Sequence, residues 1–449
     1  MKLDKPEGKF IMKIFRVIAF GMVVLMSVNE LEAQTAPLAD GLDKWLGSAY
    51  SGSQFRNHEL YWNQVTPENA GKWGSVEPAR DQMNWTAMDD AYLHAREYDA
   101  AIRFHVLVWG SQQPGWIAGL PPAEQLEEIR EWFETVASRY RRIDYLEVVN
   151  EPLHQPPDGR DGAGNYVEAL GGSGDTGWDW VITAFEMARE IFPASTKLII
   201  NDYGILSDLN AAGRYREIIE LLQERDLLDG IAVQGHAFNT RPGSFKGEQV
   251  LDFLAEAGLP IQVAEMDVDG NPNSDPNVSD EQSDQNQLND MQRIFPVLWE
   301  HEAVEGITFW GWRPGLWRQS QEAYLIRSDG SERPAMEWLR EYLEDYRSRI
   351  LSSEPESGVP QSARLVGSYP NPFERSTRIE YTVAEPAHVT VKIFDVWGRK
   401  VATLVDALKT PGDYSVTFGA GDLASGMYVY RLQAGSLAET GSMVRLTPR

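Results

Sequence analysis

The feature that most constrains the fold is a regular alternation of two hydrophobic patterns between about Leu46 and Ser348. Short apolar segments, which predict buried strands, are followed by longer segments with apolar residues at every third or fourth position, which predict amphipathic helices. Eight strands are expected, ending near Tyr50, Val65, Leu107, Val149, Asn201, Gln234, Ala264 and Trp310. Strands and helices alternating in this order predict an α/β fold, a parallel sheet closed into a (β/α)₈ TIM barrel.

The helical pattern is clearest in three segments, which are Glu124–Ser138, Asp179–Phe192 and Pro334–Ser348. In the first, Leu126, Ile129 and Trp132 share one face and leave the Glu and Arg side chains on the other. Such a stripe predicts a helix packed against the barrel.

The N-terminus carries the features of a secretory signal peptide, assigned to residues 1–33. Lys13 and Arg16 precede an apolar run from Val17 to Val28, and a cleavage site is expected after Ala33. A membrane anchor is the alternative, but the run is shorter than the ~20 residues of a membrane-spanning helix. The sequence therefore predicts a secreted or cell-surface protein.

The barrel is assigned to residues 35–350 and is followed by a predicted linker, residues 351–363, rich in Ser, Glu and Pro. In residues 364–449 the hydrophobic period changes to two, as where Val389, Val391 and Ile393 alternate with polar residues. This pattern predicts a small C-terminal β-sandwich.

Charge and cysteine content exclude several classes of function. The chain has 41 Lys and Arg against 67 Asp and Glu, a net charge of −26, so nucleic acid is not an expected partner. It has no cysteine, which excludes disulfides, a thiolate nucleophile and a cysteine metal site. No metal or organic cofactor is expected.

Two glutamates stand where a barrel concentrates its chemistry, at the carboxyl ends of strands. Glu151 follows the apolar residues of LEVVNEP, and Glu265 occupies the same place in IQVAEMDVDG. Hydrolysis of a glycosidic bond needs two such carboxyl groups. Spacing alone leaves open a structural role, in which each glutamate pairs with a neighbouring base.

Several motifs between about residues 40 and 348 resemble glycoside hydrolase family 10, in which endo-xylanases dominate. They are TPENAGKW (66–73), RFHVLVWGSQQPGW (103–116), VVNEP (148–152), INDYGI (200–205), VQGH (233–236) and FWGWRPGLW (309–317). The resemblance implies a retaining endo-1,4-β-xylanase that cleaves internal bonds of xylan by double displacement. In it Glu151 would be the general acid/base and Glu265 the nucleophile.

The same resemblance implies a set of residues that bind xylan and xylo-oligosaccharides. They are Glu68, Asn69, Lys72, His105 and Trp109 on the non-reducing side, Asn150 at the sugar 2-hydroxyl, Gln234 and His236 near the nucleophile, and Trp310 and Trp317 as an aromatic wall. Asn201, Asp202 and Tyr203 would support the site from behind. A donor such as His236 on Glu265 stabilises its ionised form, whereas Glu151 must stay protonated.

The chain departs from the family pattern at three places. Gly110 stands where the family often has His, Leu146-Glu147 where it has Trp-Asp, and Pro314 where it usually has Asp. A β-1,4-glucan or mixed-linkage glucan substrate is therefore the second hypothesis, and a non-catalytic glycan-binding protein is the third. The acidic segment Asp269–Asp290 is either a calcium-binding loop or a solvated one.

The C-terminal unit resembles the type A sorting domain of the type IX secretion system. The resemblance rests on YPNPF (369–373), DVWGRKVATLV (395–405) and LASGMYVYRL (423–432). It implies export across an outer membrane, with the secretion machinery as a partner. A carbohydrate-binding sandwich is the alternative.

Overall fold

The computed structural model describes residues 36–159, 165–352, 363–395, 399–419, 421, 423–434 and 437–446. The predicted signal peptide, residues 1–33, lies outside this range, as do residues 353–362 of the predicted linker. The chain forms two compact units that divide near Asp345. Within the described ranges, no helix combines the length and apolar character that a membrane span requires.

The first unit is a closed barrel of eight parallel strands in sequential order, which confirms the predicted fold. Its strands are β1 (Trp45–Tyr50), β2 (Gln64–Pro67), β3 (Ala101–Phe104), β4 (Tyr145–Asn150), β5 (Lys197–Asp202), β6 (Gly230–Gly235), β7 (Ile261–Met266) and β8 (Val304–Phe309). Pairing of β1 with β8 closes the barrel. All eight carboxyl ends therefore open on one mouth.

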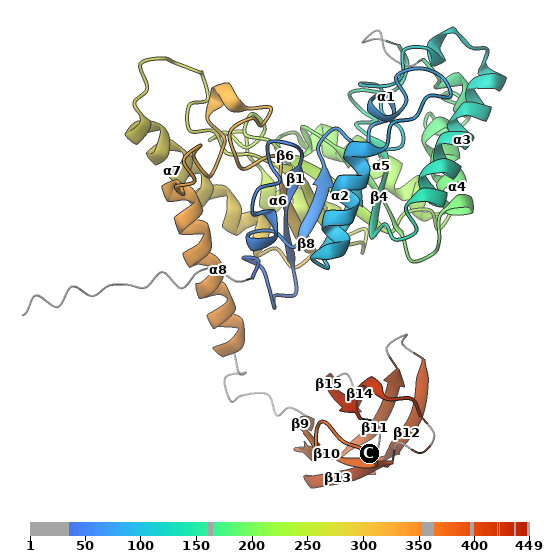
Figure 1. The fold of residues 1–449 in the computed structure, drawn as a ribbon, viewed down its shortest axis with the longest axis vertical. Coiled ribbons are helices and arrows are strands. Elements are labelled where there is room, and N and C mark those ends of the chain that lie inside the picture. Colours follow the sequence, from blue (N-terminus) through green and yellow to red (C-terminus); the bar gives the residue numbers. More distant parts are fainter. Residues whose placement is uncertain are drawn as a thin grey trace, which may run out of the picture. The chain divides into compact units, whose positions relative to one another are not determined.

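The helices lie outside the strands (Figure 1). They are α1 (Trp73–Val76), α2 (Thr86–Glu97), α3 (Pro122–Arg139), α4 (Asp179–Ile191), α5 (Leu209–Gln223), α6 (Gly247–Ala255), α7 (Asp280–Trp299) and α8 (Pro334–Ser352). In α3, Ile129 and Trp132 are buried as expected, but Leu126 is 37% exposed and does not belong to the packed face.

Two predicted boundaries and one predicted helix were wrong. β3 ends at Phe104 instead of near Leu107, although the Leu107 amide still donates to the Glu147 carbonyl on β4. β1 is followed in the described chain only by the short 3₁₀ helix η1 (His58–Leu60) before β2 begins. α8 continues through Ser352, so residues 351 and 352 are helical where the linker was predicted to start.

The second unit contains two antiparallel sheets, which confirms the predicted β-sandwich. Its strands are β9 (Ala363–Tyr369), β10 (Ser376–Val383), β11 (Ala387–Asp395), β12 (Lys400–Lys409), β13 (Gly412–Gly419), β14 (Gly426–Ala434) and β15 (Leu437–Arg445). One sheet has the order β13-β10-β9 and the other β12-β11-β14-β15. Val389, Val391 and Ile393 are buried between them, as their period of two requires.

Candidate active site

All twelve residues that the sequence singled out line one cleft at the mouth of the barrel, with a volume of about 470 Å³. They come from segments as distant in sequence as Glu68 and Trp317, because parallel strands bring their carboxyl ends together. Four further residues line the cleft and were absent from that set: Gln112, Gln155, Tyr203 and Phe238. Tyr203 had been assigned a supporting role only, and the two glutamines carry no sequence signal that distinguishes them from surface residues.

Glu151 lies directly after β4 and its carboxyl is held from both sides. One oxygen, Oε2, accepts from Trp109 Nε1 at 2.9 Å, and Oε1 accepts from Gln234 Nε2 at 3.0 Å. The residue has φ of 54°, in the left-handed region that a glutamate seldom adopts, and its amide donates to the Asn201 carbonyl at 2.7 Å. This turn directs the carboxyl into the cleft.

The surroundings of Glu151 favour its protonated form. Burial, followed by the negative charge of Glu265, raises the pKa of Glu151 to about 7, although the hydrogen bonds from Gln234 and Trp109 act in the opposite direction. A carboxyl with this pKa can donate a proton near neutral pH and take one back afterwards.

The surroundings of Glu265, on β7, favour its ionised form. Its Oε1 accepts from Asn201 Nδ2 at 2.9 Å, and its Oε2 lies 3.3 Å from His236 Nε2. Burial alone would raise the pKa of Glu265, but the hydrogen bond and charge of His236, with His105 and Arg103, lower it to about 2. Asn201 therefore touches the carboxylate itself, whereas the sequence had assigned it only a supporting role.

His236 is supported in turn by Asp267, which sequence reasoning missed. The two side chains meet at 2.6 Å between Nδ1 and Oδ2, and Asp267 Oδ2 also accepts from Trp317 Nε1 at 3.2 Å. Burial would lower the pKa of His236, but the Asp267 and Glu265 carboxylates raise it to about 10. A signal for Asp267 existed, because it follows Glu265 by two positions, the repeat that returns a strand to the same face.

One end of the cleft is built around a buried lysine. Lys72 Nζ donates to Asn69 Oδ1 at 2.9 Å and to Gln112 Oε1 at 2.6 Å, and it lies 4.9 Å from the centre of the Trp109 ring. Burial lowers the pKa of Lys72, while nearby carboxylates led by Glu265 oppose the shift. These groups present amide and ammonium donors to a polar ligand such as a sugar.

The two predicted wall tryptophans differ in their settings. Trp310 is only 6% exposed and meets the His105 ring edge-on at 5.1 Å, so it is part of the barrel core. Trp317 is 49% exposed and contacts the His236 ring edge-on at 4.8 Å. An exposed ring beside polar groups is suited to stacking on the apolar face of a sugar.

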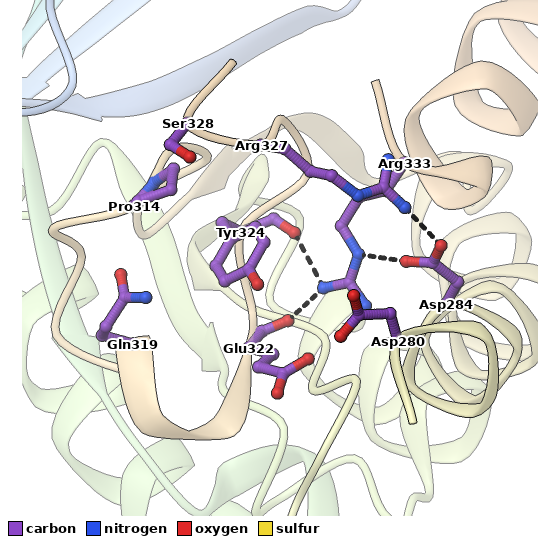
Figure 2. Close-up of a pocket in the computed structure, with 9 residues that line it drawn as sticks. All are labelled: Asp280, Asp284, Pro314, Gln319, Glu322, Tyr324, Arg327, Ser328 and Arg333. Carbon is purple, nitrogen blue, oxygen red and sulfur yellow. Dashed lines mark hydrogen bonds and ion pairs between the residues drawn. The ribbon is translucent and has the colours of Figure 1, made fainter. Parts of the chain in front are cut away.

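The loop that carries Trp317 is fastened from behind. A second, smaller pocket of about 230 Å³ lies there, with Pro314 on its wall (Figure 2). In it Arg333 donates to the carbonyl oxygens of Glu322 and Tyr324 and to Asp284 Oδ1 at 2.6 Å. Arg327 binds the other oxygen of Asp284. Asp284 thus pairs with both arginines of the pocket, and Arg333 anchors the segment between β8 and α8.

The acidic segment 269–290 is organised by protein contacts. Its second part is helical, because α7 begins at Asp280, which corrects the expectation of a loop through Asp290. Asp269 pairs with Arg318, and the Asn271 side chain both accepts from the Asp275 amide and donates to its carbonyl. Among the described residues, no group of three clustered metal-ligating side chains includes this segment.

A cleft that favours the protonated form of one carboxyl and the ionised form of a second meets the requirement of the two-carboxylate glycoside hydrolases. Residues 43–342 match the family model for glycosyl hydrolase family 10, and residues 368–444 match that of the secretion system C-terminal sorting domain. The chain belongs to glycosyl hydrolase family 10 and carries a C-terminal sorting domain. Both resemblances noted in the sequence are thereby confirmed.

Individual relatives agree with this assignment. Endo-1,4-beta-xylanase B of Cellvibrio japonicus (strain Ueda107) is 34% identical over 301 residues, which are 66% of this chain and 45% of that protein. The present chain thus spans less than half the length of this relative. Endo-1,4-beta-xylanase 2 of Claviceps purpurea is 33% identical over 279 residues, covering 61% of this chain and 77% of that protein.

Among solved structures, xylanase 10B from Thermotoga petrophila RKU-1 in complex with xylobiose is similar, with a TM-score of 0.58 and 26% identity. The match covers 69% of this chain and 96% of that one. Native xylanase 10B from Thermotoga maritima has the same score and identity, over 70% and 98% of the two chains. The similarity therefore extends over the barrel of both neighbours.

Proposed function

We propose that this chain is a retaining endo-1,4-β-xylanase in which Glu265 is the nucleophile and Glu151 the general acid/base. The observation that carries the proposal is the opposed ionisation of two carboxyl groups in one cleft. Glu265 is held ionised by His236 and Asn201, while burial keeps the Glu151 carboxyl protonated up to about neutral pH. The names of the relatives support xylan as the substrate.

The reaction follows from these states. The Glu265 carboxylate attacks the anomeric carbon, the bond from that carbon to the leaving oxygen breaks, and the Glu151 proton passes to that oxygen. Glu151, now a carboxylate, then removes a proton from a water molecule. The resulting hydroxide attacks the anomeric carbon and releases Glu265 with its charge restored. Two inversions at one carbon retain its configuration.

The remaining residues of the cleft are proposed to position the sugar chain. Lys72, Asn69 and Glu68 would bind hydroxyl groups on the non-reducing side of the cut, beside His105 and Trp109. Asn150, which donates to Glu151 and accepts from Asn201, would hold the sugar 2-hydroxyl. Gln234 would contact the substrate while it holds Glu151, and Trp310 and Trp317 would flank the sugar at the cut.

The domain arrangement supports action outside the cell. We assign residues 1–33 to a signal peptide, 35–352 to the catalytic barrel with α8, 353–362 to a linker and 363–449 to the sorting domain. The match of residues 368–444 to a secretion sorting domain supports export by the type IX machinery to the medium or the cell surface. Such a location suits a polymer that cannot enter the cell.

The experiment that tests the proposal incubates the purified chain with beechwood xylan and follows new reducing ends together with product lengths. Short xylo-oligosaccharides released from the interior of the polymer are expected, and release from carboxymethylcellulose alone would favour the glucan alternative. Glu265→Ala is expected to abolish turnover while xylan binding persists. Glu248→Ala, which changes an exposed glutamate on α6, is the matched control. An active Glu265→Ala variant would refute the mechanism.

A further inference from the structure

A fully buried arginine lies inside the barrel below the nucleophile. Arg103, on β3, has no exposed surface, and its Nη2 donates to the carbonyl oxygen of Ala264 on β7, the residue before Glu265. Among the described residues, its Nε and Nη1 have no hydrogen-bond partner. Burying a guanidinium that lacks hydrogen-bond partners costs free energy. Nearby negative charge must therefore offset the cost of burying Arg103.

That negative charge comes from two carboxyl groups. Glu147, on β4, is also fully buried, with Oε1 3.1 Å from His105 Nδ1 and 3.3 Å from Asn201 Nδ2, and its Oε2 has no hydrogen-bond partner among the described residues. Ligand atoms of His105, Glu147 and Glu265 lie within 4.8 Å of one another. Two carboxylates so close repel each other unless a positive charge lies beside them.

We propose that Arg103 is a positioning residue for the nucleophile, which holds Glu265 in place through the Ala264 carbonyl and supplies a buried positive charge to the neighbouring Glu265 and Glu147 carboxyl groups. This role rests on the proposed function of Glu265. Arg103 acts from beneath the carboxylate, and His236 acts from the side of the cleft.

The other charged and titratable groups around Glu265 leave this role to Arg103. They are Lys72 after β2, His105 on β3, Glu147 and Glu151 at β4, His236 at β6 and Asp267 after β7. The charge of His236 is shared with Asp267, and the hydrogen bonds of Lys72 go to Asn69 and Gln112. His105 lies 3.1 Å from Glu147 and also contributes to this pair, whereas the fully buried Arg103 guanidinium stays charged throughout the working pH range. Arg103 is therefore the permanent positive charge beside the two carboxyl groups.

The test compares the full-length chain with Arg103→Met, Arg103→Lys and the double variant Arg103→Met/Glu147→Gln. The first reading is the acidic limb of kcat/KM on xylan against pH. Without the positive charge, the Arg103→Met limb is expected to move to higher pH by about one unit, a tenfold loss of rate on the acid side. Arg103→Lys keeps the charge and should keep the limb. The double variant removes one charge of each sign and should move the limb back towards that of the parent chain.

The second reading is a carbon-13 NMR titration of Glu265 in glutamate-labelled protein, identified by its loss in Glu265→Gln. It does not depend on the substrate, so a chain that fails on xylan would refute the proposed function while the titration still decides the role of Arg103. A folded Arg103→Met protein with an unshifted titration would overturn the inference. If that variant does not fold, Glu147→Gln alone is compared with the double variant. Equal Glu265 titrations in those two proteins would overturn it as well.

Discussion

His236 Nδ1 lies 2.6 Å from Asp267 Oδ2, and the opposite nitrogen of the same ring lies 3.3 Å from Glu265 Oε2. The imidazole thus links two carboxylates and, when protonated, donates to both. This arrangement places a positive charge next to the proposed nucleophile before any substrate binds. The ionisation of Glu265 therefore depends, through His236, on Asp267, which is not among the residues that line the cleft.

Asp267→Asn is expected to weaken this arrangement. Loss of the Asp267 charge lowers the pKa of His236, so His236 stabilises the Glu265 carboxylate less and the pKa of Glu265 rises. The acidic limb of kcat/KM should move to higher pH by roughly one unit. Asp252→Asn removes the carboxylate of an exposed His–Asp pair, with His301, and serves as the control. An unchanged acidic limb in Asp267→Asn would contradict this reading.

Glu151→Ala should separate substrates by their leaving groups. Removal of a general acid typically costs about 10² to 10⁴ in rate, and this loss is expected in full on xylan, whose leaving sugar needs a proton. In an aryl xylobioside with an acidic phenol, the phenolate leaves without a proton. The first step on this substrate should therefore be nearly unaffected. Burst kinetics on the two substrates measure the difference, and equal losses on both would exclude Glu151 as the acid.

Trp109→Phe should alter the alkaline limb of the pH profile. The indole hydrogen bond to Glu151 Oε2 favours the carboxylate form, so its removal raises the pKa of Glu151 above about 7. The acid then stays protonated to higher pH, and the limb of kcat/KM moves upward. Gln234→Leu removes the hydrogen bond that the Gln234 amide donates to Glu151 Oε1 and should shift the alkaline limb in the same direction. A downward shift in both variants would show that these bonds do not stabilise the carboxylate.

Arg333→Met should destabilise the barrel. Arg333 is almost fully buried and binds Asp284 together with two backbone carbonyls, and breaking a buried pair on one side costs about 3 to 5 kcal/mol. Arg130→Met, in the exposed pair with Glu190, should cost less than about 1 kcal/mol. Urea unfolding measures both free energies. Equal losses would show that the anchor behind the β8–α8 segment contributes little.

Deletion of residues 364–449 should separate export from catalysis. In a host with a type IX system, the truncated chain is expected to accumulate in the periplasm. Its activity per molecule on xylan should be unchanged. Activity in the medium and in cell fractions gives the distribution. Normal export of the truncated chain would show that the sandwich has a different role. Xylan binding by the purified full chain and by the truncated chain would then be compared.

Much of this arrangement could be predicted because it follows from repeated local patterns. Glu151 and Glu265 each end an apolar strand, and a barrel gathers such positions at one mouth. The end of β3 could not be predicted, since Val106 and Leu107 continue the apolar run although the strand ends at Phe104. Val106 and Leu107 are buried although they lie outside the strand, so hydrophobicity does not show where the strand ends.

The contact between Asn201 and Glu265 was missed for a different reason. It joins β5 to β7 across the barrel interior, and its geometry depends on how the strands tilt and stagger. A strand pattern records which face a residue occupies, but it does not record which side chain it meets there. The roles of the buried Arg103 and Glu147 were missed for the same reason.

The two tryptophans beside the catalytic centre belong to parts of the molecule that can change independently. Trp310 is packed into the barrel, so a substitution there disturbs every strand that contacts it, whereas Trp317 stands on a segment fastened at its back by Arg333. Insertions or deletions between Trp310 and Arg333 would reshape one side of the cleft and leave the carboxyl groups of Glu151 and Glu265 in place. Selection for a new polysaccharide can therefore act on the length of a single loop while the chemistry is inherited intact.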